Sequence, residues 1–123
     1  MHIHYISEQN SILNHFLAQI RDVNIQKDSM RFRKNIERIG EIMAYELSKT
    51  LDYKEIDVQT PLGIKHTTTI AEPVVLCSIL RAGLALHQGF MSFFDNAENG
   101  FVSAYRHHYD NDDKFEILVE YQA

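Results

Sequence analysis

The feature that most constrains this chain is an apolar stretch at residues 74–94, in which Arg81 is the only charged side chain. Residues 74–79 are mostly apolar, which predicts a buried strand. The turn at residues 80–83 then brings in Arg81 and Gly83, and residues 84–94 continue as an uncharged, largely apolar helix. A strand, a tight turn and a buried helix in this order are typical of an α/β fold, in which ligands bind beyond the carboxyl ends of strands.

A membrane span is a competing interpretation, because the stretch is about 20 residues long. Arg81 at its centre argues against a span, since a central Arg costs about 2.5–3.5 kcal/mol on insertion, and Gly83, His87, Gln88 and Gly89 add to that argument. In the folded chain, a surface arginine at a strand end is the simplest alternative. The near neighbours of Arg81 are apolar and expected to be buried, and a buried Arg needs an anionic partner. That partner is either an internal carboxylate or a ligand phosphate.

Composition narrows the class of protein. The 123 residues suit one domain, and 45% hydrophobic with 24% charged residues is ordinary for a soluble globular protein. The net charge of −5 argues against a general nucleic-acid or membrane-surface binder. The single cysteine, Cys77, excludes a disulfide within the chain and fits a reducing compartment. We expect Cys77 to be a small buried hydrophobic residue, and the first ten residues lack the pattern of a signal peptide.

Elements on either side of this stretch are predicted from periodicity. Residues 10–50 predict two amphipathic helices, the first capped by Asn10 or Ser11 and the second by Asp28 or Ser29. Residues 53–60 and 64–70 predict a β-hairpin too polar for a core, which suggests an arm that lies over a neighbour or a second subunit. After a loop at residues 95–100, residues 101–105 predict a short strand, and the alternating segment from residue 115 onward predicts another.

Arg106 follows the predicted strand at residues 101–105, as Arg81 follows the strand before it. If the two strands are parallel neighbours, both guanidinium groups reach one edge of the sheet, where they can bind phosphate oxygens bidentately. The alternative for Arg106 is a salt bridge to an acidic residue of the 110–113 segment. Neither the histidines and acidic residues at positions 107–113 nor His2 and His4 match a zinc motif, so we predict no metal site formed by protein ligands.

Two of these segments carry a family resemblance. The sequences SILRAG at residues 78–83 and AYR at residues 104–106 resemble the pyrophosphate-loop and following-strand motifs of uracil phosphoribosyltransferase. The Phe32–Arg33 and Tyr45–Glu46 pairs and the arm around residues 55–63 are also similar to that family. The resemblance implies an α/β fold of the type I phosphoribosyltransferase kind: a mostly parallel sheet with the Arg81 strand inside, flanking helices and a β-hairpin arm. We divide it into N-terminal helices at 10–50, a hairpin arm at 53–70 and a pyrophosphate-loop sheet unit at 73–121.

The resemblance also implies an activity. The family transfers ribose 5-phosphate from phosphoribosyl pyrophosphate to uracil, giving UMP and pyrophosphate in pyrimidine salvage, usually with magnesium. It further implies a cytoplasmic homo-oligomer that binds neither nucleic acid nor membrane. Arg81 and Arg106 are then expected to contact the pyrophosphate side of the donor, while the backbone at Leu80, Ala82 and Gly83 helps to hold it. Cationic groups on a leaving pyrophosphate stabilise the charge that develops in the transition state.

The sequence also departs from the family pattern. Ser78 stands where the family usually has proline, and Ala104 stands where it often has methionine. The match covers about the first half of the family's length, without its threonine- and glycine-rich ribose-phosphate loop or its uracil-recognition segment. We therefore expect an incomplete domain, and no turnover by the 123-residue chain alone. Two alternatives stay open: another phosphoribosyltransferase or a regulator of the same fold, and a non-catalytic binding or assembly module whose helices and arm associate with another chain.

Overall fold

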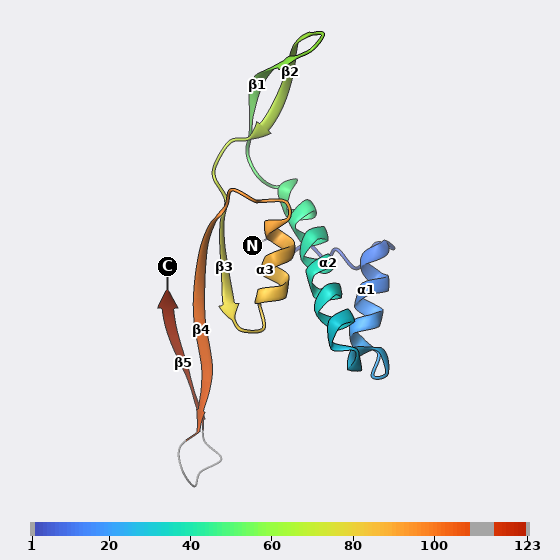
Figure 1. Ribbon diagram of the computed structural model, residues 1–123, viewed down its shortest axis with the longest axis vertical. Helices are drawn as coiled ribbons and strands as arrows, with labels where there is room; N and C mark the ends of the chain where they lie inside the picture. Colours follow the sequence, from blue (N-terminus) through green and yellow to red (C-terminus); the bar gives the residue numbers. More distant parts are fainter. Residues whose placement is uncertain (1, 109–114, 123) are drawn as a thin grey trace.

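A computed structural model describes the backbone of residues 2–108 and 115–122, and the side chains of residues 2–105 and 117–120. Three helices lie in successive layers against one face of a three-stranded sheet, and a two-stranded hairpin extends away from them (Figure 1). The helices are α1 (Ile12–Arg21), α2 (Ser29–Ser48) and α3 (Leu84–Met91), with a short 3₁₀ helix, η1 (Ile25–Lys27), between the first two. The hairpin is β1 (Tyr53–Thr60) with β2 (Gly63–Ile70), and the sheet is β3 (Val75–Leu80), β4 (Glu98–His108) and β5 (Phe115–Gln122).

The first two helices begin where the sequence predicts. The Ser11 hydroxyl accepts a hydrogen bond from the backbone N–H of Leu13 at 3.2 Å, and the Asp28 carboxylate accepts one from the N–H of Arg31 at 3.0 Å. Each cap satisfies one of the four N–H groups that a helix leaves without an intrahelical partner. Of the alternative caps considered for each helix, Ser11 and Asp28 are therefore correct.

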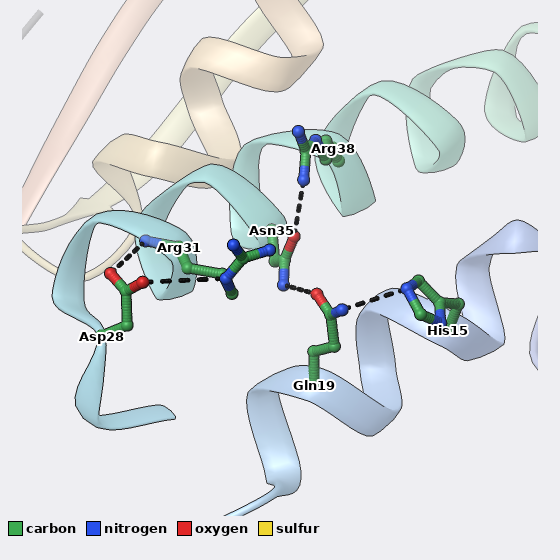
Figure 2. A network of polar contacts seen from close by, with 6 residues as sticks. All are labelled: His15, Gln19, Asp28, Arg31, Asn35 and Arg38. Carbon is green, nitrogen blue, oxygen red and sulfur yellow. Dashed lines mark hydrogen bonds and ion pairs between the residues drawn. The ribbon is translucent and has the colours of Figure 1, made fainter. Parts of the chain in front are cut away.

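A polar network joins α1 to α2 (Figure 2). Asn35 is fully buried, donates to the Gln19 side-chain oxygen at 2.7 Å and accepts from Arg38 at 3.0 Å. The guanidinium of Arg38 also lies 5.3 Å from the ring centroid of Phe16, in a cation–π contact. Burial of Asn35 is tolerated because its amide oxygen and nitrogen both have partners.

Helix α3 lies between α2 and the sheet (Figure 1). Its backbone approaches α2 very closely at two glycines: a Cβ atom placed on Gly89 would lie 2.1 Å from the carbonyl oxygen of Glu37, and one on Gly40 would lie 2.5 Å from that of Leu86. A small core contains Ala44 of α2, Leu76 of β3 and Phe94 after α3, together with partly buried apolar side chains. The α2–α3 contact therefore fixes where α3, and the turn that precedes it, lie over the sheet.

The sheet is mixed and ordered β3–β4–β5, with β3 parallel to β4 and β4 antiparallel to β5. The predicted mostly parallel sheet with the Arg81 strand inside is therefore wrong in two respects, because the second pairing is antiparallel and β3 lies at an edge of the described sheet. The reason lies in the connections: α3 carries the chain back to start β4 parallel to β3, whereas six residues separate β4 from β5, too few for the crossover that parallel strands need. The α/β class itself is confirmed.

Strand β4 is longer than predicted. It begins at Glu98, inside the segment expected to be a loop, and continues to His108. Arg106 consequently lies within β4 and not at its carboxyl end. Backbone pairing on both sides explains the extension, because residues 98–100 pair with residues 75–77 of β3, and residues 101–108 pair with β5 from Gln122 back to Phe115. Such pairing satisfies the N–H and C=O groups of residues that the side-chain pattern alone does not mark as strand.

The two faces of the sheet differ. Leu76 is buried beneath α3, whereas Val75 and Ile79 on the opposite face of β3 are 64% and 61% exposed. Cys77 shares that outer face and is exposed, so the prediction of a buried thiol is wrong. Arg81 is exposed as well, so the prediction of buried surroundings is also wrong. Both errors have one cause, since the helices of the described chain cover only one face of the sheet (Figure 1).

The hairpin is confirmed by the pairing of Tyr53 with Ile70 through to Thr60 with Gly63. It projects from the rest of the chain (Figure 1), and Leu62 at its tip is fully exposed. Gly63 has φ of 134°, a conformation that residues with a side chain rarely adopt. Among the described residues, none of the helices is both long enough and apolar enough to span a membrane.

Candidate functional site

The turn between β3 and α3 is held by its own backbone. The N–H of Gly83 donates to the carbonyl of Ile79 at 3.0 Å, the N–H of Leu84 to that of Arg81 at 3.2 Å, and the N–H of His87 to that of Gly83 at 2.9 Å. A Cβ atom on Gly83 would lie 2.6 Å from the Ile79 carbonyl oxygen, so only glycine fits at this position without a shift. The peptide bond between Leu80 and Arg81 is cis.

Arg81 extends from this turn into solvent. Among the side chains that the structure describes, no carboxylate lies within 4.0 Å of its guanidinium, so the internal carboxylate considered as its partner is not found there. Gly83, the residue before α3, contributes no side-chain cap. Although the N–H of Leu84 is bonded to Arg81, those of Ala85 and Leu86 have no partner among the described residues and are open to a ligand. An exposed guanidinium next to a helix N-terminus is an arrangement that suits an anion.

Arg106 is on the strand next to β3. The two strands are parallel neighbours, with Leu80 opposite Ser103. This pairing is what the prediction of a shared sheet edge requires. Arg106 lies three positions beyond Ser103 along β4. Its side chain lies outside the described side chains, as do His107 and His108, and residues 109–114 lie outside the described backbone. The joint contact of Arg81 and Arg106 with one anion, and the alternative salt bridge of Arg106, both stay predictions.

Metal binding by protein ligands finds no support in the part of the chain that the structure describes. No three His, Cys, Asp or Glu side chains gather there closely enough to hold an ion. The acidic segment and the two histidines that follow Arg106 lie outside it.

Hollows in the described surface lie elsewhere. One, of about 430 Å³, is formed by the N-terminal segment together with α1 and α2, and another lies on the hairpin between Glu55 and Thr68. Neither contains Arg81. Arg81 and Ala82 are exposed in this chain, so the chemistry proposed for the turn rests on its guanidinium and its amides.

Three polar residues close to the turn form a network that was not predicted from the sequence. Both ring nitrogens of His87 in α3 are hydrogen-bonded. Nδ1 lies 2.7 Å from Ser78 Oγ of β3, and Nε2 lies 2.7 Å from Asn99 Oδ1 of β4. His87 is only 7% exposed. The available signal was a lone histidine in an otherwise apolar helix, together with the replacement of the usual proline by Ser78.

Comparison with known proteins places the chain in a family. Residues 6–118 match the sequence model of the family described as uracil phosphoribosyltransferase. A uracil phosphoribosyltransferase of Porphyromonas gingivalis is 48% identical over 123 residues, which is 100% of this chain and 56% of that protein. One from Thermococcus gammatolerans is 37% identical over 119 residues, 95% of this chain and 51% of that protein. A solved structure of an Aquifex aeolicus protein superposes with a TM-score of 0.74 at 27% identity, covering 92% of this chain and 52% of that one.

The chain thus spans about half the length of the curated relatives that it matches. Within that half, the family match includes β3, the Arg81 turn, α3 and β4. This agreement of motif, fold and sequence identity means that the chain belongs to the uracil phosphoribosyltransferase family.

Proposed function

We propose that this chain contributes the pyrophosphate-binding part of a uracil phosphoribosyltransferase, which converts uracil and phosphoribosyl pyrophosphate into UMP and pyrophosphate. The observation that carries the proposal is the exposed Arg81 on the turn between β3 and α3, beside the parallel strand that carries Arg106. Family membership supplies the reaction, because the relatives bear that name.

The physical basis is the charge of the leaving group. When the bond between ribose and pyrophosphate breaks, negative charge grows on the pyrophosphate, and a guanidinium already in place stabilises it without reorganisation. Arg81 supplies such a charge, and the N–H groups at the start of α3 add partial positive charge at the same place. The backbone of Leu80, Ala82 and Gly83 is the proposed cradle, and Arg106 the second guanidinium.

Magnesium is part of the proposal by family resemblance only. The described residues do not gather the ligands for a protein-bound ion, so they do not fit a dedicated magnesium site. We therefore assign no step to it here and propose that it enters with the phosphates of the donor, as Mg²⁺ commonly does.

Other parts of the proposal follow from the relatives. Because the chain spans about half their length, we propose that the 123-residue chain alone binds the pyrophosphate side of the donor but does not turn over. Assembly into a homo-oligomer and a cytoplasmic location belong to the same proposal. The exposed outer face of β3 and the projecting hairpin support association with another copy.

Pyrophosphate binding tests the site directly. In isothermal titration of the purified chain with magnesium pyrophosphate, we expect Arg81→Ala to weaken binding by roughly ten- to a hundredfold, because a charged hydrogen bond contributes about 1.5–3 kcal/mol. Arg21→Ala is the matched control, since Arg21 is an exposed arginine in the last turn of α1. Equal affinity in the wild type and in Arg81→Ala would refute the site.

A second assay separates the enzyme from the alternative of an assembly module. We expect no uracil-dependent pyrophosphate release by the isolated chain, whose intact mass must be verified. In that case the double variant with Arg81→Ala and Arg106→Ala should abolish donor binding while leaving the oligomeric state, measured by sedimentation, unchanged. An assembly module predicts oligomers with no donor binding even in the wild type.

A further inference from the structure

A chain of side-chain hydrogen bonds crosses three elements just behind the Arg81 turn. Ser78 of β3 bonds to Nδ1 of His87 in α3 at 2.7 Å, and Nε2 of His87 bonds to Asn99 of β4 at 2.7 Å. The His87 ring also packs on Phe101, with centroids 5.1 Å apart. His87 is nearly buried, so both of its ring nitrogens depend on these partners.

The hydrogen bond between Asn99 and Ala97 determines which atom donates in each of the other two bonds of the network. The Asn99 side-chain nitrogen donates to the carbonyl of Ala97 at 3.1 Å, which turns its oxygen toward His87. An amide oxygen only accepts, so Nε2 of His87 must carry a proton. In the neutral ring Nδ1 then accepts, and the Ser78 hydroxyl donates to it. The network therefore selects one tautomer of a neutral imidazole and leaves neither of its nitrogens without a partner.

The bond between Ser78 and His87 also closes a ring around the turn. Ser78 precedes Ile79, whose carbonyl accepts from Gly83, and the backbone N–H of His87 donates to the carbonyl of Gly83. Backbone hydrogen bonds thus hold the turn to β3 on one side and to α3 on the other, and the side-chain bond between Ser78 and His87 connects these two elements. Asn99 extends the connection to β4, the strand that carries Arg106.

We propose that Ser78, His87 and Asn99 are positioning residues, which hold the turn at residues 80–83 in one conformation and in fixed relation to β4. The proposal rests on the proposed function in one respect, namely that this turn is the pyrophosphate site. In chemical terms, a serine hydroxyl and a neutral Nε2–H histidine fix the orientation of the backbone N–H groups of the turn and of Arg81. The Ser78 hydroxyl lies within a strand beneath α3 and is engaged with His87, so it acts by position and not as a nucleophile.

The test that needs no ligand uses nuclear magnetic resonance of the ¹⁵N-labelled full chain. We expect the ring nitrogens of the neutral His87 imidazole to report the Nε2–H tautomer. Ser78→Ala should shift or broaden the backbone amide signals of Ala82 and Gly83, whereas Ser78→Thr, which keeps the hydroxyl, should restore them. Ser103→Ala is the matched control, because Ser103 lies opposite Leu80 on β4 but outside this network.

Asn99→Ala provides a second variant that should fold, because Asn99 is exposed. It should abolish the tautomer preference of His87, seen as a mixture of the two neutral forms. Unchanged amide signals of the turn in Ser78→Ala, or an Nδ1–H tautomer in the wild type, would overturn the proposal. Turn signals that change equally in Ser78→Ala and Ser78→Thr would also overturn it, because the hydroxyl would then not be the cause.

Binding of magnesium pyrophosphate links the network to the proposed function. Ser78→Ala should weaken binding roughly two- to tenfold, as expected for loss of one neutral hydrogen bond, and Ser78→Thr should bind like the wild type. If the wild type binds and Ser78→Ala binds equally well, the positioning role is refuted. If the wild type does not bind at all, the proposed function fails, and the amide signals of the turn still decide whether the network positions it.

Discussion

The contact between α2 and α3 gives the sharpest prediction on stability, through the substitution Gly89→Ala. A Cβ atom on Gly89 would lie 2.1 Å from the Glu37 carbonyl oxygen, 2.9 Å from the Glu41 nitrogen and 2.9 Å from the Gly40 Cα atom. All three are backbone atoms of α2, so no side chain can rotate away to make room. The helices would have to separate by about 1.3 Å to restore ordinary contact at 3.4 Å.

Two opposing effects decide the sign of the change. Alanine is a better helix former than glycine by about 1 kcal/mol, which favours the variant. Overpacking costs about 1–3 kcal/mol and occasionally more, and here the obstacle is rigid backbone, which places the cost at the upper end. A gap of this size also removes a large part of the dispersion contact along the rest of the interface. We therefore expect a net loss of at least about 2 kcal/mol, which lowers the melting temperature by roughly 8 °C in a chain of this size.

Thermal and urea unfolding followed by circular dichroism measure this loss. Gly100→Ala is the matched control, since its Cβ atom would meet only the Cys77 sulfur at 3.8 Å, an ordinary contact. Gly40→Ala should also destabilise, and the double variant with Gly89→Ala should lose less than the sum, because the first substitution already separates the helices. A Gly89→Ala variant that unfolds at or above the wild-type temperature would refute the close packing of α2 on α3.

Three further predictions concern other parts of the fold. Asp28→Ala should lower the free energy of unfolding by about 1 kcal/mol through loss of the α2 cap, measured by urea denaturation, and Asp28→Asn should restore most of it. Asn35→Leu should cost about 1–3 kcal/mol in the same assay, because Gln19 and Arg38 lose their buried partner; no change would contradict the network. Ile79→Glu should reduce concentration-dependent self-association in analytical ultracentrifugation without lowering the melting temperature, since Ile79 is 61% exposed.

Local signals in the sequence were sufficient for much of the fold. Both helix starts followed from pairs of candidate caps, Asn10 or Ser11 and Asp28 or Ser29, and the hairpin followed from alternation around the turn near Gly63. These features depend on residues close together in the chain, so they can be read without knowing the tertiary structure. The Arg81 turn was placed correctly for the same reason, because a charge and a glycine interrupt an apolar stretch.

Features that depend on distant residues were not predictable in this way. The length of β4 is set by its pairing with β3 and β5, and the α2–α3 approach by two glycines 49 positions apart. The Ser78–His87–Asn99 network joins three elements, each contributing one polar residue whose partners lie in the other two elements. Side-chain periodicity within one segment gives no information on contacts between distant segments, which are seen only in the folded structure.

The errors at Cys77 and Arg81 have a physical meaning of their own. β3 is apolar at nearly every position, a pattern typical of strands buried on both faces. The structure covers only the face that contains Leu76, and Val75, Cys77 and Ile79 are exposed on the other. Neighbouring strands continue this outer face with Val102, Ala104, Ile117 and Val119, as the register requires.

The outer face of the sheet is therefore an apolar surface, and its exposure to water is unfavourable. Exposed apolar area of this kind favours association, because each square ångström removed from water contributes about 25 cal/mol. A second copy of this chain placing the same face against it would bury Ile79 and Val75 while leaving Arg81 at the end of β3. Ile79→Glu weakens the driving force without changing a side chain of the turn at residues 80–83, so self-association should respond to Ile79→Glu and pyrophosphate binding to Arg81→Ala.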